Sequence, residues 1–202
     1  MKFDIELHRQ LSDSIIIDYG IIKGNNNILL IKAGQDGSMY GYNNKYLEIA
    51  KAINKEYGST VICSSNPFDG NNPLDDAMQV IELYCQENNI KDYEIYYMGH
   101  SKGGLIGAWF GINYTKIKRM LLVNAPLMYN YSKTKDGINK FKGEQITLIY
   151  GSLDPSYIYI ELLSAIHNDN FKYYVIDNQN HNFSQDVYDF KKLPFDYLYK
   201  KD

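Results

Sequence analysis

The chain has 202 residues, of which 45% are hydrophobic and 22% are charged, as is usual for a globular protein. Its 21 Lys and Arg residues and 24 Asp and Glu residues give a net charge of −3. A balance this close to neutral gives no general electrostatic attraction to nucleic acid or to an anionic membrane. The composition therefore argues against a nucleic-acid-coating protein, a collagen-like fibre, a disordered chain and a disulfide scaffold.

The N-terminal region has charges spread through it and no apolar centre. Residues 1–10 read MKFDIELHRQ, which is not the pattern of a secretory signal peptide. No apolar run approaches the roughly 20 residues that a membrane-spanning helix needs. The two cysteines, Cys63 and Cys85, are too few for a metal cluster of their own and are expected to be buried, reduced thiols. We therefore expect a cytoplasmic protein that spans no membrane.

The first half of the chain begins with extended segments and then alternates between strands and helices. Apolar residues alternate with charged ones over residues 3–7, and a second extended stretch follows at 15–22. Residues 28–31 form a continuous apolar run, which is typical of a strand buried on both faces. The next elements expected are a helix at 42–57, a strand at 60–63 and a helix that begins at Pro73.

The second half repeats this alternation. Strands are expected at 95–98, 120–123, 146–150 and 173–176, and helices at 102–112, at 156–167 and between Gln185 and Lys192, the last ending before Pro194. Strands separated by helices imply a mostly parallel sheet, with helices on both faces and an antiparallel start. We therefore expect a single α/β domain over residues 1–202, built on a sheet of about eight strands.

A serine between two glycines is the first chemical motif. The segment Gly99-His100-Ser101-Lys102-Gly103 fits the pattern G-x-S-x-G, and the expected strand runs into it while the expected helix runs out. This strand–turn–helix arrangement is that of a nucleophile elbow, where glycines let a strained serine lie close to its neighbours. Ser101 is therefore the candidate nucleophile.

A serine hydroxyl needs a base to remove its proton, and four histidines are available. His8 precedes the serine motif, and His100 is beside Ser101 in a tight turn and points elsewhere. His167 is near the end of an expected helix, where a surface cation is the simpler interpretation. His181 follows the last expected strand, in a loop that opens at the carboxyl edge of the sheet. We favour His181 as the base.

An acidic residue that orients the base is expected between the serine and the histidine in the chain. Asp154 directly follows an apolar strand, in the turn-forming segment Gly-Ser-Leu-Asp-Pro. An alternative role for Asp154 is to cap the helix that follows. Its position favours the catalytic role. Less favoured acids, which suit a loop, a cap or a solvated position, are Asp136, Asp169 and Asp177.

A tetrahedral intermediate needs two N–H donors near its oxyanion. The backbone amide of Lys102, directly after the nucleophile, is the first candidate. The second should come from the loop at 32–39, whose glycines allow a sharp bend. Gln35 is the first choice in this loop and Asp36 the second. The alternative is that the loop is an ordinary strand-to-helix turn.

Taken in this order, the motifs resemble those of the α/β-hydrolase superfamily over nearly the whole chain. The segments Gly-Ser-Leu-Asp-Pro and Asn-His-Asn-Phe look like the acid and histidine neighbourhoods of that family. The resemblance implies an α/β-hydrolase fold and a Ser-His-Asp mechanism. The common His-Gly of the family's oxyanion loop is Ala33-Gly34 here. Either Asp36 points away from the oxyanion, or this loop is built differently.

The spacing of the motifs leaves no room for a long cap domain. Only residues 125–144 remain unassigned between Ser101 and Asp154 once the expected elements are placed. We therefore expect an open site, or one shaded by a short loop. The candidate substrate-binding residues are Asp36, Met39, Met128 and Tyr129. The alternative for the loop residues among them is ordinary surface packing.

The sequence therefore predicts a serine hydrolase that cleaves a small ester or thioester through an acyl-enzyme, with no metal or organic cofactor. The same three residues on the same fold also serve acyltransferases and peptidases. The alternative from another class is a ligand-binding protein without catalysis, because a fold alone does not establish a function.

Overall fold

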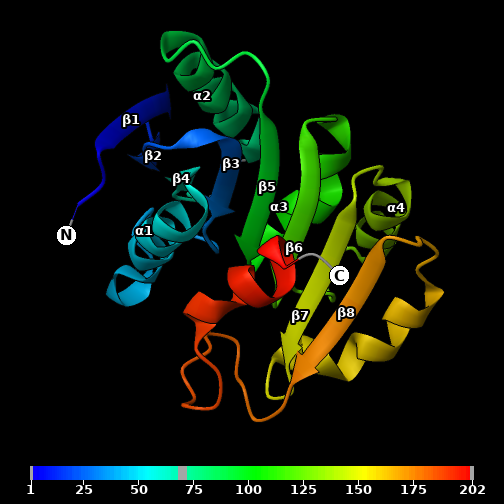
Figure 1. Cartoon of the computed structure of the whole chain (residues 1–202). Helices are drawn as coiled ribbons and strands as arrows, with labels where there is room; N and C mark the ends of the chain where they lie inside the picture. The colour runs from blue at the N-terminus through cyan, green and yellow to red at the C-terminus, as the bar shows by residue number, and fades with distance from the viewer. Residues whose placement is uncertain (1, 68–71, 201–202) are drawn as a thin grey trace.

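The computed structural model describes residues 2–67 and 72–200, which form one eight-stranded sheet with helices on both faces (Figure 1). The strands lie in the order β1-β2-β4-β3-β5-β6-β7-β8. Their bounds are β1 Ile5–Ser12, β2 Ile15–Ile22, β3 Asn25–Lys32, β4 Ser59–Ser64, β5 Glu94–His100, β6 Ile117–Val123, β7 Gln145–Gly151 and β8 Phe171–Ile176. β2 pairs antiparallel with β1 and β4, and the remaining neighbours pair in parallel. The predicted topology is therefore confirmed.

The helices divide between the two faces of the sheet. α1 (Lys45–Tyr57) and the C-terminal segment pack on one face. The other face is covered by α2 (Pro73–Glu87), α3 (Lys102–Phe110) and α4 (Tyr131–Lys140). The other helical segments are η1 (Tyr42–Asn44), η2 (Gly111–Asn113), η3 (Pro155–Ala165), η4 (Phe190–Lys192) and η5 (Phe195–Tyr199).

The apolar run in β3 supplies side chains to both faces. Ile28 and Leu30 are buried in the cluster that includes α2 and α3, whereas Leu29 and Ile31 are buried in the cluster that includes α1. Successive side chains of a strand point to opposite faces, so a strand covered on both sides must be apolar throughout. This central strand ends at the loop that precedes α1.

The carboxyl ends of the parallel strands lie together at the bottom of Figure 1. Ser101, Asp154 and His181 follow β5, β7 and β8 at this edge. In open parallel sheets, ligands bind at the carboxyl ends of the strands. The topology therefore brings together three side chains that are far apart in the sequence.

The segment at 125–144, expected to be a loop, contains α4. Asn130 caps this helix, because its Oδ1 accepts a hydrogen bond from the Lys133 amide at 3.1 Å. Gly137 lets the helix lie against α3, since a Cβ there would be 1.9 Å from the Ala108 carbonyl oxygen. Asp136 lies on α4 and pairs with Lys140. The insertion between β6 and β7 is thus one short helix, and residues 2–67 and 72–200 form no large cap.

The prediction of a helix between Gln185 and Lys192 is wrong. Within that range only the turn η4 is helical, and a separate helical segment, η5, follows Pro194. The intervening chain wraps around the buried Gln179, whose amide donates to the carbonyl oxygens of Gln185 and Tyr188, each at 3.0 Å. These carbonyl groups are used by a side chain instead of by a helix.

The predicted helix at 156–167 is present as the 3-10 segment η3. Cys63 and Cys85 are free and buried, as expected. No helix within residues 2–67 and 72–200 is long and apolar enough to cross a membrane.

Candidate active site

Ser101 lies at a sharp turn between β5 and α3. Its backbone has φ 54° and ψ −121°, a conformation that costs a non-glycine residue about 1–3 kcal/mol. The turn is held by the Ser101 amide, which donates to the Val123 carbonyl of β6 at 2.8 Å. Such strain persists only where the surrounding structure enforces it, and it is concentrated at functional sites.

The two flanking glycines are required by close backbone contacts. A Cβ on Gly99 would lie 2.3 Å from the Gly103 carbonyl oxygen, and a Cβ on Gly103 would lie 2.3 Å from that of Lys32. Any larger residue would push α3 away from β5 or from β3. The G-x-S-x-G spacing therefore follows from the packing of this elbow.

A continuous chain of hydrogen bonds joins the three candidate catalytic side chains. The Nε2 atom of His181 lies 3.0 Å from Ser101 Oγ. The Nδ1 atom of the same ring lies 2.5 Å from Asp154 Oδ2. The Asp154 side chain is fully buried, whereas that of His181 is 35% exposed. A buried carboxylate that accepts from Nδ1–H leaves Nε2 as the acceptor facing the serine.

Asp154 also caps η3, so the contacts required by the two roles considered for it are both present. Its Oδ1 atom accepts a hydrogen bond from the Ser156 amide at 2.7 Å, while Oδ2 faces His181. One carboxylate oxygen fixes the side chain to its own turn, and the other is left for the imidazole.

The loop that carries His181 is held from below by two side chains that the sequence did not indicate for this task. His100 Nε2 and Asn124 Nδ2 both lie within hydrogen-bond distance of the His181 carbonyl oxygen, at 2.8 and 2.9 Å. Asn124 Oδ1 also accepts a hydrogen bond from the Gly151 amide at 3.0 Å. Asn124 thereby links the loop that carries His181 to the end of β7. Its only sequence signal was its position directly after an apolar strand.

His100 is a neutral imidazole in this arrangement. Burial lowers its pKa to about 3, with a smaller contribution from the nearby Lys45 charge. A carbonyl oxygen only accepts, so Nε2 must carry the proton that His100 donates to His181. The expectation that His100 points away from Ser101 agrees with this contact.

The loop after β3 lies against the elbow. A Cβ on Gly34 would be 3.3 Å from Ser101 Cβ, so the next amide in the chain, Gln35 N–H, belongs to a loop that contacts the elbow. That amide has no hydrogen-bond acceptor among the residues that the structure describes. The Asp36 amide is already used, since it donates to the Asn66 carbonyl at 2.8 Å. Gln35 therefore stays the predicted second donor, beside Lys102, the first residue of α3.

The predicted substrate-binding residues separate into two groups. Met39 is only 5% exposed and packs in the core with residues of α1, so its assignment to the substrate site is corrected to a packing role. Met128 and Tyr129 are 46% and 64% exposed, and the Met128 sulfur accepts a weak hydrogen bond from Ser156 Oγ at 3.8 Å. Asp36 is also exposed.

The other candidate acids and bases lie elsewhere. His8 on β1 pairs with Asp18 at 2.7 Å, and the His167 amide donates to the Asn139 side chain on α4. Within residues 2–67 and 72–200, no three His, Cys, Asp or Glu side chains form a group that could hold a metal ion.

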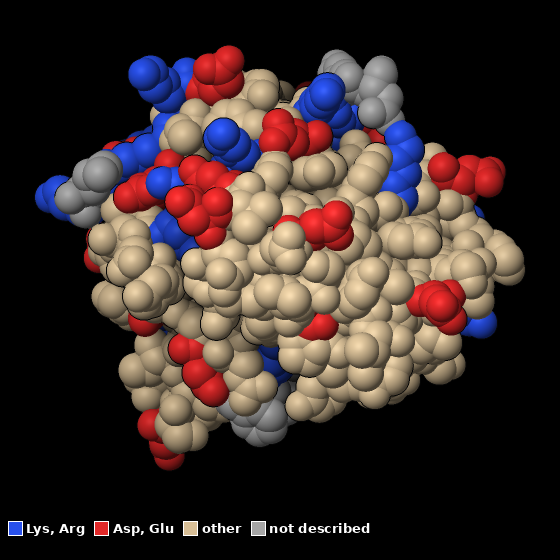
Figure 2. All heavy atoms as spheres, turned by 90° about the horizontal axis from the view of Figure 1, so that it is seen from below, with Lys and Arg blue, Asp and Glu red and all other residues tan. Residues whose placement is uncertain are grey.

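Figure 2 views the molecule from the edge at which the parallel strands end. Acidic and basic side chains are scattered over this face, and a large part of the visible surface carries neither.

Comparisons with known proteins support the fold through structure alone. No family model and no curated protein sequence matches the chain. The solved structures that are similar include an α/β serine hydrolase homologue from Coxiella burnetii, with a TM-score of 0.70, 15% identity and 96% of each chain covered. Another is Est1E from Butyrivibrio proteoclasticus, with a TM-score of 0.69, 15% identity and coverage of 90% of this chain and 92% of Est1E.

A third similar structure is XC6422 from Xanthomonas campestris, described as an α/β serine hydrolase without a lid. Its TM-score is 0.68 at 16% identity, over 94% of this chain and 90% of XC6422. The chain therefore has the α/β-hydrolase fold. It takes this fold in the form without a large cap.

Proposed function

We propose that the protein is a serine hydrolase that cleaves a small ester or thioester through an acyl-enzyme on Ser101. One observation carries the proposal: the hydrogen-bonded series from Ser101 Oγ through His181 to the buried Asp154. A strained serine at the end of a strand, next to a histidine whose other nitrogen is held by a carboxylate, is the arrangement that activates a hydroxyl.

In the acylation step, Ser101 Oγ bonds to the acyl carbon and its proton passes to His181 Nε2. Asp154 stabilises the imidazolium through Nδ1–H and fixes the orientation of the ring. The backbone amides of Lys102 and Gln35 donate to the oxyanion. The intermediate then expels the alcohol or thiol, which takes the proton from Nε2.

In the deacylation step, His181 removes a proton from water as the water oxygen bonds to the acyl carbon. The acyl–Oγ bond then breaks, Nε2 returns the proton to Ser101 Oγ, and the carboxylic acid is released. Met128, Tyr129 and Asp36, all exposed, are proposed to contact the substrate at the rim. The esterases and serine hydrolases among the similar structures support this class of reaction.

The proposal is tested by measuring hydrolysis of p-nitrophenyl esters and acyl thioesters of increasing chain length. Turnover that disappears in Ser101→Ala, with an unchanged melting temperature, is the expected result. Product formed on an added alcohol in preference to water would identify an acyltransferase instead. A folded protein without turnover on esters, thioesters or peptides would favour a binding protein.

A further inference from the structure

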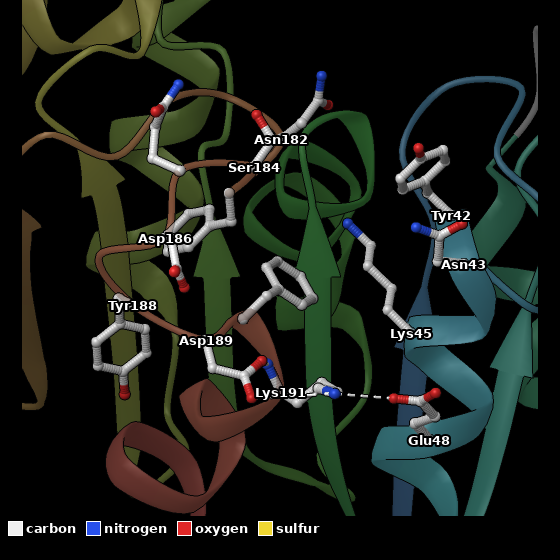
Figure 3. A pocket seen from close by; sticks show the side chains of 13 residues that line it. Tyr42, Asn43, Lys45, Glu48, Asn182, Ser184, Asp186, Tyr188, Asp189 and Lys191 are labelled. Atoms are coloured by element: carbon white, nitrogen blue, oxygen red, sulfur yellow. Dashed lines mark hydrogen bonds and ion pairs between the residues drawn. The ribbon is translucent and has the colours of Figure 1, made fainter.

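A cavity of about 970 Å³ lies on the α1 face of the sheet, next to the loop that carries His181. One wall is the chain from Tyr42 to Glu48, and the other is the chain from Asn182 to Lys191. Figure 3 shows the Lys45 side chain reaching from α1 into the space between these walls. The cavity does not include the candidate catalytic side chains, but it begins at the residue that follows His181.

Lys45 is a desolvated cation whose donors are unused. Among the described residues, its ammonium has no ion-pair partner and no hydrogen-bond acceptor. Its nearest attraction is the face of Phe190, whose ring centroid lies 4.1 Å from Nζ. A cation–π contact leaves the three N–H donors of an ammonium without acceptors. Burial lowers the pKa of Lys45 to about 8, so the group remains mostly charged at neutral pH.

The acidic groups of the cavity do not serve as partners for Lys45. Lys191 forms an ion pair with Glu48 at 2.9 Å and lies 4.0 Å from Asp189. Figure 3 shows the pair with Glu48 at one end of the cavity. Asp186 lies on the wall opposite Lys45. These three carboxylates disfavour a highly charged anion, whereas a single negative charge beside Lys45 would match its single positive charge.

The remaining surface of the cavity is suited to an organic ligand. Phe183 and Phe190 are buried beneath it, and their rings pack edge to face. Asn43, Asn182 and Ser184 add polar groups on the two walls. The ring of Tyr42, which also lines the cavity, is 80% exposed. A ligand with an apolar body and one acid group could thus pack on this ring and pair with the ammonium together.

We propose that this cavity binds a small organic monocarboxylate, with Lys45 as the counter-ion of the carboxylate. The ion pair forms in a partly desolvated site, where it is stronger than in water. The proposal concerns binding only, so it does not depend on the hydrolase activity proposed above.

The test is a titration of the full chain with benzoate, followed by ¹⁵N NMR and calorimetry, with the neutral benzamide as the matched ligand. Benzoate is expected to bind and to shift the amides of Asn182 and Ser184, and benzamide to bind at least tenfold more weakly. Lys45→Met should lower the affinity for benzoate at least tenfold. Lys55→Met, which removes an exposed charge from the same helix, should leave it unchanged.

Equal binding of benzoate and benzamide, or equal effects of the two lysine variants, would overturn the proposal. Inorganic phosphate that binds as tightly as benzoate would also overturn it, in favour of a general anion site. A melting temperature separates binding from packing. Lys45→Met should lower it only slightly, because among the described residues the ammonium forms no ion pair or hydrogen bond and loses mainly its cation–π contact with Phe190. A large drop would overturn the proposal in favour of a structural role for Lys45 on that ring.

Discussion

The imidazole of His100 donates a hydrogen bond to the backbone carbonyl of His181 over 2.8 Å, so the residue before Ser101 helps to hold the loop that carries His181. The same carbonyl accepts from Asn124. Two buried donors on one carbonyl fix the start of the loop, and the ring of His181 then has Ser101 on one nitrogen and Asp154 on the other.

The first prediction concerns His100 as a positioning residue. His100→Ala should lower kcat on an ester substrate by about fivefold, since a lost hydrogen bond is worth about 1 kcal/mol. KM should change little, because His100 is not expected to touch the substrate. His100→Gln, which keeps a donor, should recover part of the rate. An equal loss in both variants, or a change confined to KM, would contradict this role.

The second prediction concerns stability at low pH. The pKa of His100 is lowered to about 3 by burial, while in the unfolded chain it is near 6.5. Between these values the unfolded state binds a proton that the folded state does not, so this group lowers stability as the pH falls below about 6.5.

Urea unfolding at pH 7 and pH 5 measures this effect. From pH 7 to pH 5, the free energy of unfolding should fall by about 2 kcal/mol more in the wild type than in His100→Gln, because the variant has no titrating group at this position. Parallel pH profiles for the two proteins would show that His100 takes up its proton equally in both states.

The third prediction separates the two roles of Asp154. Asp154→Asn should reduce kcat by about 10³–10⁴-fold, because the histidine tautomer is lost, while its side-chain oxygen can still cap η3. Asp154→Ala should show the same loss of rate and a further loss of about 1 kcal/mol in the free energy of unfolding. Near-normal rates in Asp154→Asn would assign the acid to another residue.

The fourth prediction concerns the elbow glycines. Gly103→Ala should destabilise the protein by about 2 kcal/mol or more, because the new methyl group would meet the Lys32 carbonyl at 2.3 Å. Gly104→Ala is the matched control, since its methyl would meet the Ala125 side chain at 2.9 Å and can be accommodated by a smaller shift. Thermal unfolding of both variants should rank them in that order.

Local pattern was enough to predict the sheet and the elbow. The run from Ile28 to Ile31 requires burial on both faces, and the glycines around Ser101 require close packing. The candidate acid and base could be chosen because Asp154 and His181 directly follow strands, and parallel strands end at one edge.

Other features depend on contacts between distant parts of the chain. α4 was missed because its segment is polar and contains Gly137. This glycine lets α4 pack closely against Ala108 of α3, a contact that the local sequence does not indicate. The prediction of a helix at 185–192 was wrong because carbonyl groups of that segment accept hydrogen bonds from the buried Gln179 side chain. Met39 was placed in the site although it packs in the core. The cavity at Lys45 could not be foreseen, since its two walls are far apart in the sequence.

The most direct test of the proposed catalytic centre is labelling of the pure protein with a fluorophosphonate probe, with the adduct located by peptide mass spectrometry. The account predicts a single adduct on Ser101, absent in Ser101→Ala and formed far more slowly in His181→Ala. A folded protein that is not labelled, or that is labelled equally fast without His181, would contradict an activated serine.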